Sequence, residues 1–396
     1  MAAIAVVAVV ALTACGSSSS NSSNDTSGGS GGDIPTSISP STFKVDFAAM
    51  DQLKSLAAKG KGLVGVLLPD TTSSARYETF DRPYLTKALQ AAGLSSSDFK
   101  VDNAQGSTST MQTQAEADIT KGATVLLIDA IDSGSAAAIE REAKSKGVAV
   151  IDYDRLVQGG TEGRFYVSFD NVKVGQLIGQ GEESCIAAWK VTKPNILVMD
   201  GDPTDNNASL FAQGYNGVLK SHFDDGSYVK VGEPAGTWTP SVAATTFQQQ
   251  LTAHPNINAV ITPNDDNANA VIAILKSQHT PARTFPTTGQ DASLSGLQNV
   301  LAGYQCGTVY KPIYVEAQAA VALALYLRAG EKAPSGLVNA TSKDPKGGDV
   351  DSVFLTPIWV TTTNMASTVV ADKGVNVTQL CTSALASACT TAGINK

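Results

Sequence analysis

Acidic, amide and basic side chains recur in this sequence directly after short apolar runs. Many residues in such positions only cap the helix that follows. Capping does not explain the whole set, because Arg155 and Lys311 also occupy these positions. Carboxylates, amides and cations together suit an uncharged polyhydroxyl ligand, since a hydroxyl donates to an acid and accepts from Arg, Lys or Asn. The residues are Asp70, Asn103, Asp129, Asp152, Asp154, Arg155, Asp170, Asn171, Asp200, Asp202, Asn264, Asp265, Asp266, Gln290, Asp291 and Lys311.

The apolar runs that precede these residues alternate with helix-like segments from Gly62 onward. Strands that alternate with helices predict parallel sheets covered on both faces, with ligands bound beyond the carboxyl ends of the strands. About ten runs are too many for one small open sheet. We therefore predict an α/β fold with two Rossmann-like lobes. The runs are Leu63–Leu68, Phe99–Val101, Thr124–Ile128, Val148–Ile151, Phe165–Val167, Ile196–Met199, Tyr228–Val231, Ala259–Ile261, Phe285–Thr288 and Thr308–Tyr310.

A TIM barrel is the alternative fold at this number of strands. An isolated extended piece, Val353–Val360, follows the helix-like segment Ile313–Arg328 and has no further strand–helix unit after it. A barrel needs no such late return, so this piece favours two lobes.

The first fifteen residues have the pattern of an export signal. A short apolar run ends in Leu12-Thr13-Ala14-Cys15, which resembles a bacterial lipobox in which Cys15 is lipidated. The run lacks the usual opening Lys or Arg, so we expect the natural start to lie upstream. Residues 16–41 are rich in Ser, Gly and Asn and predict a flexible tether. We therefore expect an extracytoplasmic protein, lipid-anchored to the cell membrane.

Four further cysteines, Cys185, Cys306, Cys381 and Cys389, make disulfides plausible in an exported protein. Four cysteines allow three pairings. We favour Cys381 with Cys389 because they lie close together in the sequence.

Composition and motifs argue against several classes of function. The net charge is −8 and no basic run occurs, which argues against a nucleic-acid partner. The three histidines are isolated, and no Cys-x-x-Cys, Walker or dinucleotide-binding motif is present. A calcium-like loop that begins at Asp200 has Asp205 where glycine is needed and Phe211 where glutamate is needed. We predict no enzyme activity, no cofactor and no metal site.

Six stretches, in order along the chain, resemble the xylose-binding group of the type I periplasmic sugar-binding family, which serves ABC importers. The similarity extends from about Gly62 to Val360. The stretches are Asp152–Arg155, Tyr166–Gly175, Asp205–Ala208, Thr288–Ala292, Thr308–Ile313 and Leu355–Ile358.

The resemblance implies two lobes joined by three crossings, with sugar held between them. It places residues 62–168 and 312–352 in an N-terminal lobe and residues 169–311 and 353–396 in a C-terminal lobe. The crossings then fall near Ser168–Asn171, Gln290–Lys311 and Leu355–Ile358.

The resemblance also implies a set of ligand-binding residues. Asp154 and Arg155 match a pair that grips adjacent hydroxyls, and Tyr77 stands where the family has a stacking tryptophan. Either Asn206 or Asn207 contacts the ligand. Aromatic rings suit the apolar faces of a sugar, while charged groups suit its polar edges. The complete set is Arg76, Tyr77, Asp154, Arg155, Asn206, Asn207, Trp238, Asn264, Asp291 and Lys311.

These features imply a monomeric lipoprotein that binds a monosaccharide by hinge closure and delivers it to an ABC permease. The first candidate for the monosaccharide is D-xylose. Glucose, arabinose and galactose remain open as ligands. A sugar-sensing lipoprotein that presents its ligand to a membrane receptor is the alternative function. Sugar-responsive repressors share this fold, but a signal and a tether occupy the place of their DNA-binding head.

Overall fold

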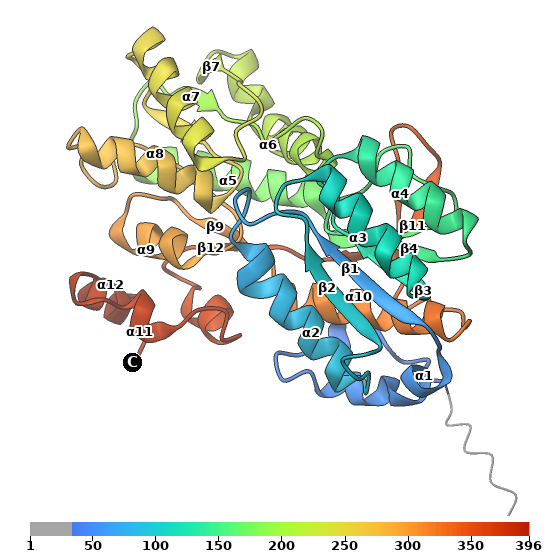
Figure 1. Cartoon of the computed structure of the whole chain (residues 1–396). Helices are drawn as coiled ribbons and strands as arrows, with labels where there is room; N and C mark the ends of the chain where they lie inside the picture. Colours follow the sequence, from blue (N-terminus) through green and yellow to red (C-terminus); the bar gives the residue numbers. More distant parts are fainter. Residues whose placement is uncertain (1–33, 396) are drawn as a thin grey trace, which may run out of the picture. The chain divides into compact units, whose positions relative to one another are not determined.

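The computed structural model describes residues 34–395 and contains a seven-stranded, mostly parallel sheet (Figure 1). Its strand order is β10-β11-β5-β4-β3-β1-β2, and only β10 pairs antiparallel, with β11. Successive residues of β1 face opposite sides, so Val66 and Leu68 join one apolar core and Leu67 another. The strands are β1 Leu63–Leu68, β2 Phe99–Asn103, β3 Ala123–Ile128, β4 Ala149–Tyr153, β5 Phe165–Phe169, β10 Ala340–Lys343 and β11 Asp349–Leu355.

Helices cover both faces of this sheet. On one face lies α10, which is mostly apolar and almost entirely buried, as such a pattern requires. The other face is covered by α3 and α4 (Figure 1). We call the sheet with these helices and the preceding short ones the first lobe. Its helical elements are η1 Pro40–Thr42, η2 Ala48–Leu53, α1 Lys54–Lys59, η3 Tyr77–Asp81, α2 Arg82–Ala91, α3 Thr108–Thr120, α4 Ser133–Ser145 and α10 Ile313–Arg328.

A second lobe is built on a three-stranded parallel sheet of order β7-β6-β8. Helices α5 and α6 pack together on one side of it, and α7 and α8 lie on the other. A short antiparallel ribbon of β9 and β12 adjoins it. The elements are α5 Asn171–Ala188, β6 Asn195–Val198, α6 Asn206–Asp224, β7 Val229–Gly232, α7 Pro240–Ala253, β8 Ala259–Ile261, α8 Asp265–Ser277, α9 Leu294–Ala302, β9 Thr308–Tyr310 and β12 Ile358–Val360.

The chain passes between the lobes three times. It leaves β5 at Phe169 and begins α5 at Asn171, and it ends β9 at Tyr310 before α10 begins at Ile313. The third passage joins β11 to β12 through residues 356–357. After β12, a C-terminal segment, residues 361–395, packs on α9 (Figure 1). It contains η4 Ala366–Val370, α11 Val377–Leu380, η5 Ser383–Leu385 and α12 Ala386–Thr391.

The structure differs from the sequence-based expectations in three places. Residues 353–355, expected in the C-terminal lobe, form the end of β11 because they pair with β5 of the first sheet. The run Phe285–Thr288 makes only an isolated bridge, Thr287 with Val260, instead of a strand. Residues 34–41, expected in the tether, belong to the folded body, because Ile38 is fully buried and Pro35 O accepts a hydrogen bond from Tyr326.

Two disulfides are present among the described residues. Cys185 of α5 pairs with Cys306, and Cys381 pairs with Cys389, the pair favoured from sequence. The export signal, Cys15 and residues 16–33 of the tether lie outside the described residues. In residues 34–395, no helix has both the length and the apolar content needed to cross a membrane.

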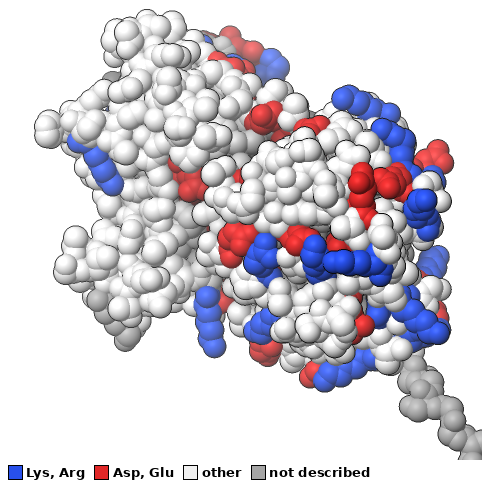
Figure 2. Space-filling view, viewed as in Figure 1, with Lys and Arg blue, Asp and Glu red and all other residues white. Residues whose placement is uncertain are grey.

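Charged side chains are unevenly distributed over the face shown in Figure 2. They gather over the first lobe, with Lys and Arg interspersed among Asp and Glu, whereas the surface over the second lobe is nearly uncharged. The sequence accounts for this difference, since α7 and α9 contain no charged residue. This face therefore presents no continuous basic surface.

Candidate functional site

A cavity lies between the two lobes at the carboxyl ends of their strands. Its empty volume, which includes some open solvent, is about 290 Å³, so it suits only a small ligand. Nine of the ten residues predicted from sequence line it, and Asn206 does not. The lining residues are Ser73, Ser74, Arg76, Tyr77, Asp154, Arg155, Asp205, Asn207, Phe211, Trp238, Asn264, Gln290, Asp291 and Lys311.

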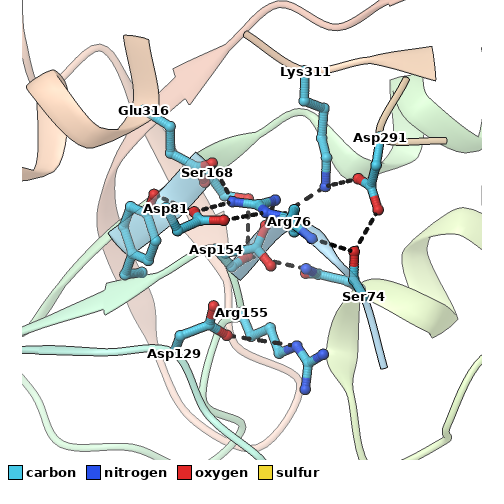
Figure 3. Close-up of polar contacts among 12 residues, drawn as sticks. Ser74, Arg76, Asp81, Asp129, Asp154, Arg155, Ser168, Asp291, Lys311 and Glu316 are labelled. Atoms are coloured by element: carbon cyan, nitrogen blue, oxygen red, sulfur yellow. Dashed lines mark hydrogen bonds and ion pairs between the residues drawn. The ribbon is translucent and has the colours of Figure 1, made fainter. Parts of the chain in front are cut away.

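Arg76 is held by three buried carboxylates (Figure 3). It donates through Nε and Nη2 to both oxygens of Asp81, at 2.9 and 2.7 Å, through Nη1 to Asp154 at 2.8 Å and through Nη2 to Glu316 at 2.7 Å. Burial opposes its charge, but Asp154, Asp81 and Glu316 raise the pKa of Arg76 well above the ordinary value. These contacts keep Arg76 charged and hold its guanidinium group in one orientation before any ligand binds.

Lys311 lies between one carboxylate of each lobe. Its Nζ is 3.7 Å from Asp154 Oδ1 and 3.4 Å from Asp291 Oδ1. Burial raises the pKa of Asp154, but Arg76 and Lys311 outweigh that effect and hold the pKa below its usual value. Both aspartates have left-handed backbone, with φ of 59° and 89°, a conformation that concentrates at functional sites.

Arg155 forms a second polar cluster with Tyr77. Its Nη2 donates to the Tyr77 hydroxyl at 2.8 Å, and its Nη1 donates to a backbone carbonyl at 3.0 Å. Its Nε lies 3.2 Å from Asp205 and 3.6 Å from Asp129. Burial raises the pKa of Tyr77, which keeps the phenol neutral. Arg155 thus fixes the position of the Tyr77 ring at the cavity wall.

Two amides of the second lobe face the first lobe, and one of them, Asn264, also caps a helix. Asn264 accepts a hydrogen bond from the backbone of α8 and donates to Ser73 O at 3.1 Å. Asn207, at the start of α6, donates to Asp154 O at 3.0 Å. The side chain of its neighbour Asn206 instead accepts a hydrogen bond from Gln158 at 2.9 Å, outside the cavity. The structure thus separates the two asparagines that the sequence left undecided.

Trp238 supplies the second aromatic wall. Its ring makes an edge-on contact with Phe211, with centroids 6.5 Å apart and an interplanar angle of 81°. A Cβ atom at Gly201 would overlap the indole, so only glycine there leaves space for the ring. Trp238 and Tyr77 therefore give the cavity two aromatic surfaces, one from each lobe.

Four buried polar atoms of the cavity lining make no hydrogen bond within residues 34–395, although Arg155 Nε and Asp291 Oδ1 each have an ion-pair contact, with Asp205 and Lys311. Two are donors and two are acceptors, a mixture that hydroxyl groups satisfy. A buried polar atom left without any partner costs about 1–3 kcal/mol, which applies here to Trp238 Nε1 and Gln290 Oε1, and these two atoms indicate a ligand that bonds to them. The four atoms are Arg155 Nε, Trp238 Nε1, Gln290 Oε1 and Asp291 Oδ1.

The charges around the cavity favour a neutral ligand. Three cations, Arg76, Arg155 and Lys311, face six carboxylates, Asp81, Asp129, Asp154, Asp205, Asp291 and Glu316. Burial raises the pKa of three of these acids, namely Asp129, Asp205 and Glu316. These shifts oppose ionisation of the three acids and so reduce the excess of negative charge around the cavity. No group of acids, histidines or cysteines in the described chain has a metal-holding arrangement.

Sequence reasoning missed five cavity residues. Gln290 was expected at a strand end but was not included in the ligand-binding set, and Asp205 lies in the stretch Asp205–Ala208, from which only Asn206 and Asn207 were chosen. Ser73 and Ser74 follow β1, so their position after a strand was an available signal. Phe211 is one turn inside α6, and no local pattern distinguishes it from a core residue.

Comparisons with known proteins agree with this architecture. The sequence model of the periplasmic binding protein domain family matches residues 64–332 of this chain. The D-xylose-binding periplasmic protein of Escherichia coli is 35% identical over 296 residues, 74% of this chain and 85% of that protein. The multiple sugar-binding periplasmic receptor ChvE of Rhizobium radiobacter is 32% identical over 325 residues, 78% of this chain and 89% of that protein.

A solved structure shows the same fold. A solute-binding protein of an ABC transporter from Clostridium phytofermentans, with bound β-D-glucose, has a TM-score of 0.71 and 28% identity, covering 80% of this chain and 99% of its own. The α/β prediction is confirmed. These homologues are solute-binding proteins and not enzymes. With the domain model matched over 64–332 and a relative aligned over most of its length, the chain belongs to the periplasmic binding protein family.

Proposed function

We propose that this chain is an extracytoplasmic sugar-binding lipoprotein of an ABC importer, with D-xylose as its ligand. The observation that carries the proposal is the small interlobe cavity with two aromatic walls and four buried polar atoms that make no hydrogen bond. Aromatic surfaces match the C–H faces of a pyranose, and the polar atoms match its hydroxyls.

Xylose is placed first because of the relatives. Two D-xylose-binding periplasmic proteins, from Escherichia coli and Haemophilus influenzae, are 35% and 34% identical to this chain. Glucose is the second candidate, since two structural neighbours at 28% and 25% identity carry it. Arabinose and galactose belong to the same test, because a pyranose that differs in one substituent offers similar faces and hydroxyls.

Titration calorimetry of the full chain carrying Cys15→Ser tests this proposal. The panel is xylose, glucose, arabinose, ribose and galactose. We expect micromolar or tighter binding of one or two of these sugars, with xylose among them. Absence of binding across the panel, by protein whose folding is verified by circular dichroism, would exclude a simple sugar as the ligand. Tight binding of glucose without binding of xylose would support a monosaccharide ligand and identify it as glucose instead of xylose.

We further propose that the two lobes close over the sugar about the three crossings. Support comes from hydrogen bonds that join the lobes around the cavity, namely Ser74 with Asp291, Asn264 with Ser73 and Asn207 with Asp154. A sugar that contacts both lobes favours the closed arrangement through its differential affinity. Small-angle scattering with and without sugar tests this step, and an unchanged radius of gyration would contradict it.

The lipid anchor on Cys15 is part of the same proposal, supported by the Leu-Thr-Ala-Cys sequence. We expect labelled palmitate to be incorporated into the chain in cells and the Cys15→Ser variant to remain unlabelled and to be released from the membrane. Labelling of the variant at the same level would place the anchor elsewhere.

A sugar-sensing role is the second candidate, because one relative is named a receptor. Uptake of labelled xylose by a deletion strain separates the two roles. A fall in uptake supports import, whereas unchanged uptake with a lost transcriptional response supports sensing.

A further inference from the structure

A second, larger hollow opens beside the sugar cavity. We call it the outer groove and define it by Phe80 of the first lobe, Asp266 and Leu294 of the second lobe, and Val375 and Gln379 of the C-terminal segment. Its empty volume is about 1390 Å³, against about 290 Å³ for the inner cavity. Both figures include open solvent, and they make the outer groove the larger of the two spaces.

The two spaces share walls and are separated by few atoms. Ser74, Arg76 and Asp291 line both of them. Across the boundary, Ser74 Oγ donates to Asp291 Oδ2 at 2.9 Å, as Figure 3 shows, and the backbone N–H of Ala75 donates to Asp266 at 3.0 Å. The direct Ser74–Asp291 contact leaves no space for a further oxygen, so it must open for a substituent to pass from the inner cavity into the groove. An ether or hydroxyl oxygen of the ligand would then accept the hydrogen bond of the serine.

The lining of the outer groove has the two kinds of surface that a sugar needs. Phe80, Leu294 and Val375 are half-buried and present apolar surface. Asp266 contributes a carboxylate, and Gln379 contributes an exposed amide. One wall comes from the C-terminal segment, which is fastened to α9 by the hydrogen bond from Gln298 to Gln379 O at 2.9 Å.

From this geometry we infer that the outer groove is a second sugar subsite, which holds a ring joined by a glycosidic bond to the ring in the inner cavity. The ligand class is then a disaccharide or a glycoside as well as the free monosaccharide. This inference rests on the proposed function, because it requires a sugar in the inner cavity.

Calorimetry of the full chain carrying Cys15→Ser, with xylose, methyl β-xyloside and xylobiose, tests the inference. We expect xylobiose to bind within tenfold of xylose. The Phe80→Ala variant should reduce the affinity for xylobiose at least tenfold and the affinity for xylose less than threefold, since Phe80 lines the groove and not the inner cavity. Phe223→Ala is the matched control, because Phe223 is also half-buried but lies on α6 outside the groove, and it should leave both affinities unchanged.

A second variant tests the same subsite in case Phe80→Ala disturbs the folding of the protein. Val375→Trp fills the groove from the C-terminal segment, so it should abolish xylobiose binding and spare xylose. Binding of xylose without xylobiose would overturn the subsite and leave the proposed function intact. Equal losses for both ligands in both groove variants would also overturn it. Absence of binding by every sugar would remove the proposed function, and the subsite with it.

Discussion

Lys311 joins the two lobes electrostatically, because its Nζ lies 3.7 Å from Asp154 of the first lobe and 3.4 Å from Asp291 of the second. Lys311 itself belongs to the short link between β9 and α10. A cation at a crossing therefore neutralises two carboxylates that would otherwise repel each other across the cavity. The positive charge of Lys311 therefore favours the arrangement in which Asp154 and Asp291, and with them the two lobes, lie close together.

Replacement of this lysine should weaken both binding and folding. Lys311→Met keeps most of the side-chain length but leaves two buried carboxylates without their shared cation. We expect sugar affinity to fall at least tenfold and the free energy of unfolding to fall by about 3–5 kcal/mol, as when one partner of a buried ion pair is removed. Calorimetry and urea unfolding measure the two effects. Lys220→Met, which breaks the exposed pair with Asp224, is the control and should cost about 1 kcal/mol or less.

The neighbouring asparagines provide a matched pair of variants. Asn207 lines the cavity and donates to Asp154 O, whereas Asn206 contacts Gln158 outside it. We expect Asn207→Ala to reduce sugar affinity at least tenfold and Asn206→Ala to reduce it less than threefold, as measured by calorimetry. A larger effect at Asn206 would contradict the placement of the two side chains.

Trp238 should report sugar binding through its fluorescence. Its ring lines the cavity, while the other two tryptophans, Trp189 and Trp359, lie outside the lining. We expect sugar to change the emission of the native protein and to leave that of Trp238→Phe unchanged. Phenylalanine keeps a stacking surface but removes the indole N–H, so affinity should fall by about three- to tenfold. A persistent fluorescence change in Trp238→Phe would assign the response to another tryptophan.

Buried acids should make the protein less stable as the pH rises. Burial raises the pKa of Asp265 from 3.8 to about 7, and it raises those of Asp118 and Asp200 to about 6. The folded state therefore binds more protons than the unfolded state between these values, and the resulting stability is complete below pH 4 and lost as the pH rises through 6 to 7.

For Asp265 alone, the loss between pH 5 and pH 8 amounts to about 2–3 kcal/mol. Urea unfolding at the two pH values measures it. The variant Asp265→Asn cannot ionise, so it should show a smaller pH dependence. Stability that increases from pH 5 to pH 8, or an unchanged dependence in the variant, would contradict the assignment.

The two disulfides should contribute unequally to stability. Cys185 and Cys306 are 121 residues apart, whereas Cys381 and Cys389 are 8 apart. Loop-closure entropy predicts a cost of about 5 kcal/mol for losing the long loop and about 2.5 kcal/mol for the short one. Unfolding of the two double Cys→Ala variants compares them, and a larger cost for the short loop would argue against an entropic origin.

Local patterns in the sequence predicted much of the fold and of the candidate site. Short apolar runs followed by helical periodicity predicted an α/β chain, because strand and helix formation depend on residues near in sequence. The same logic placed Asp154, Arg155, Asn264 and Asp291 among the strand-end residues, since ligands of parallel sheets bind beyond the carboxyl ends of strands, and the family resemblance then assigned them to the ligand-binding set. The late piece Val353–Val360 predicted a return crossing, and the structure divides it between β11 and β12 of different sheets.

Other features depend on contacts between residues that are distant along the chain, and only the tertiary structure decided them. Arg76 is oriented by Asp81 nearby and by Glu316, 240 positions away on α10. The side chains of Asn206 and Asn207 diverge because adjacent residues in a helix point in directions about 100° apart, which the sequence does not relate to a cavity. The burial of Ile38, the hydrogen bond from Tyr326 to Pro35 O and the groove beside Asp291 also depend on residues far apart in the sequence. Residue types and periodicity thus determined the kind of fold and the kind of site, while long-range packing determined which side chains meet and where.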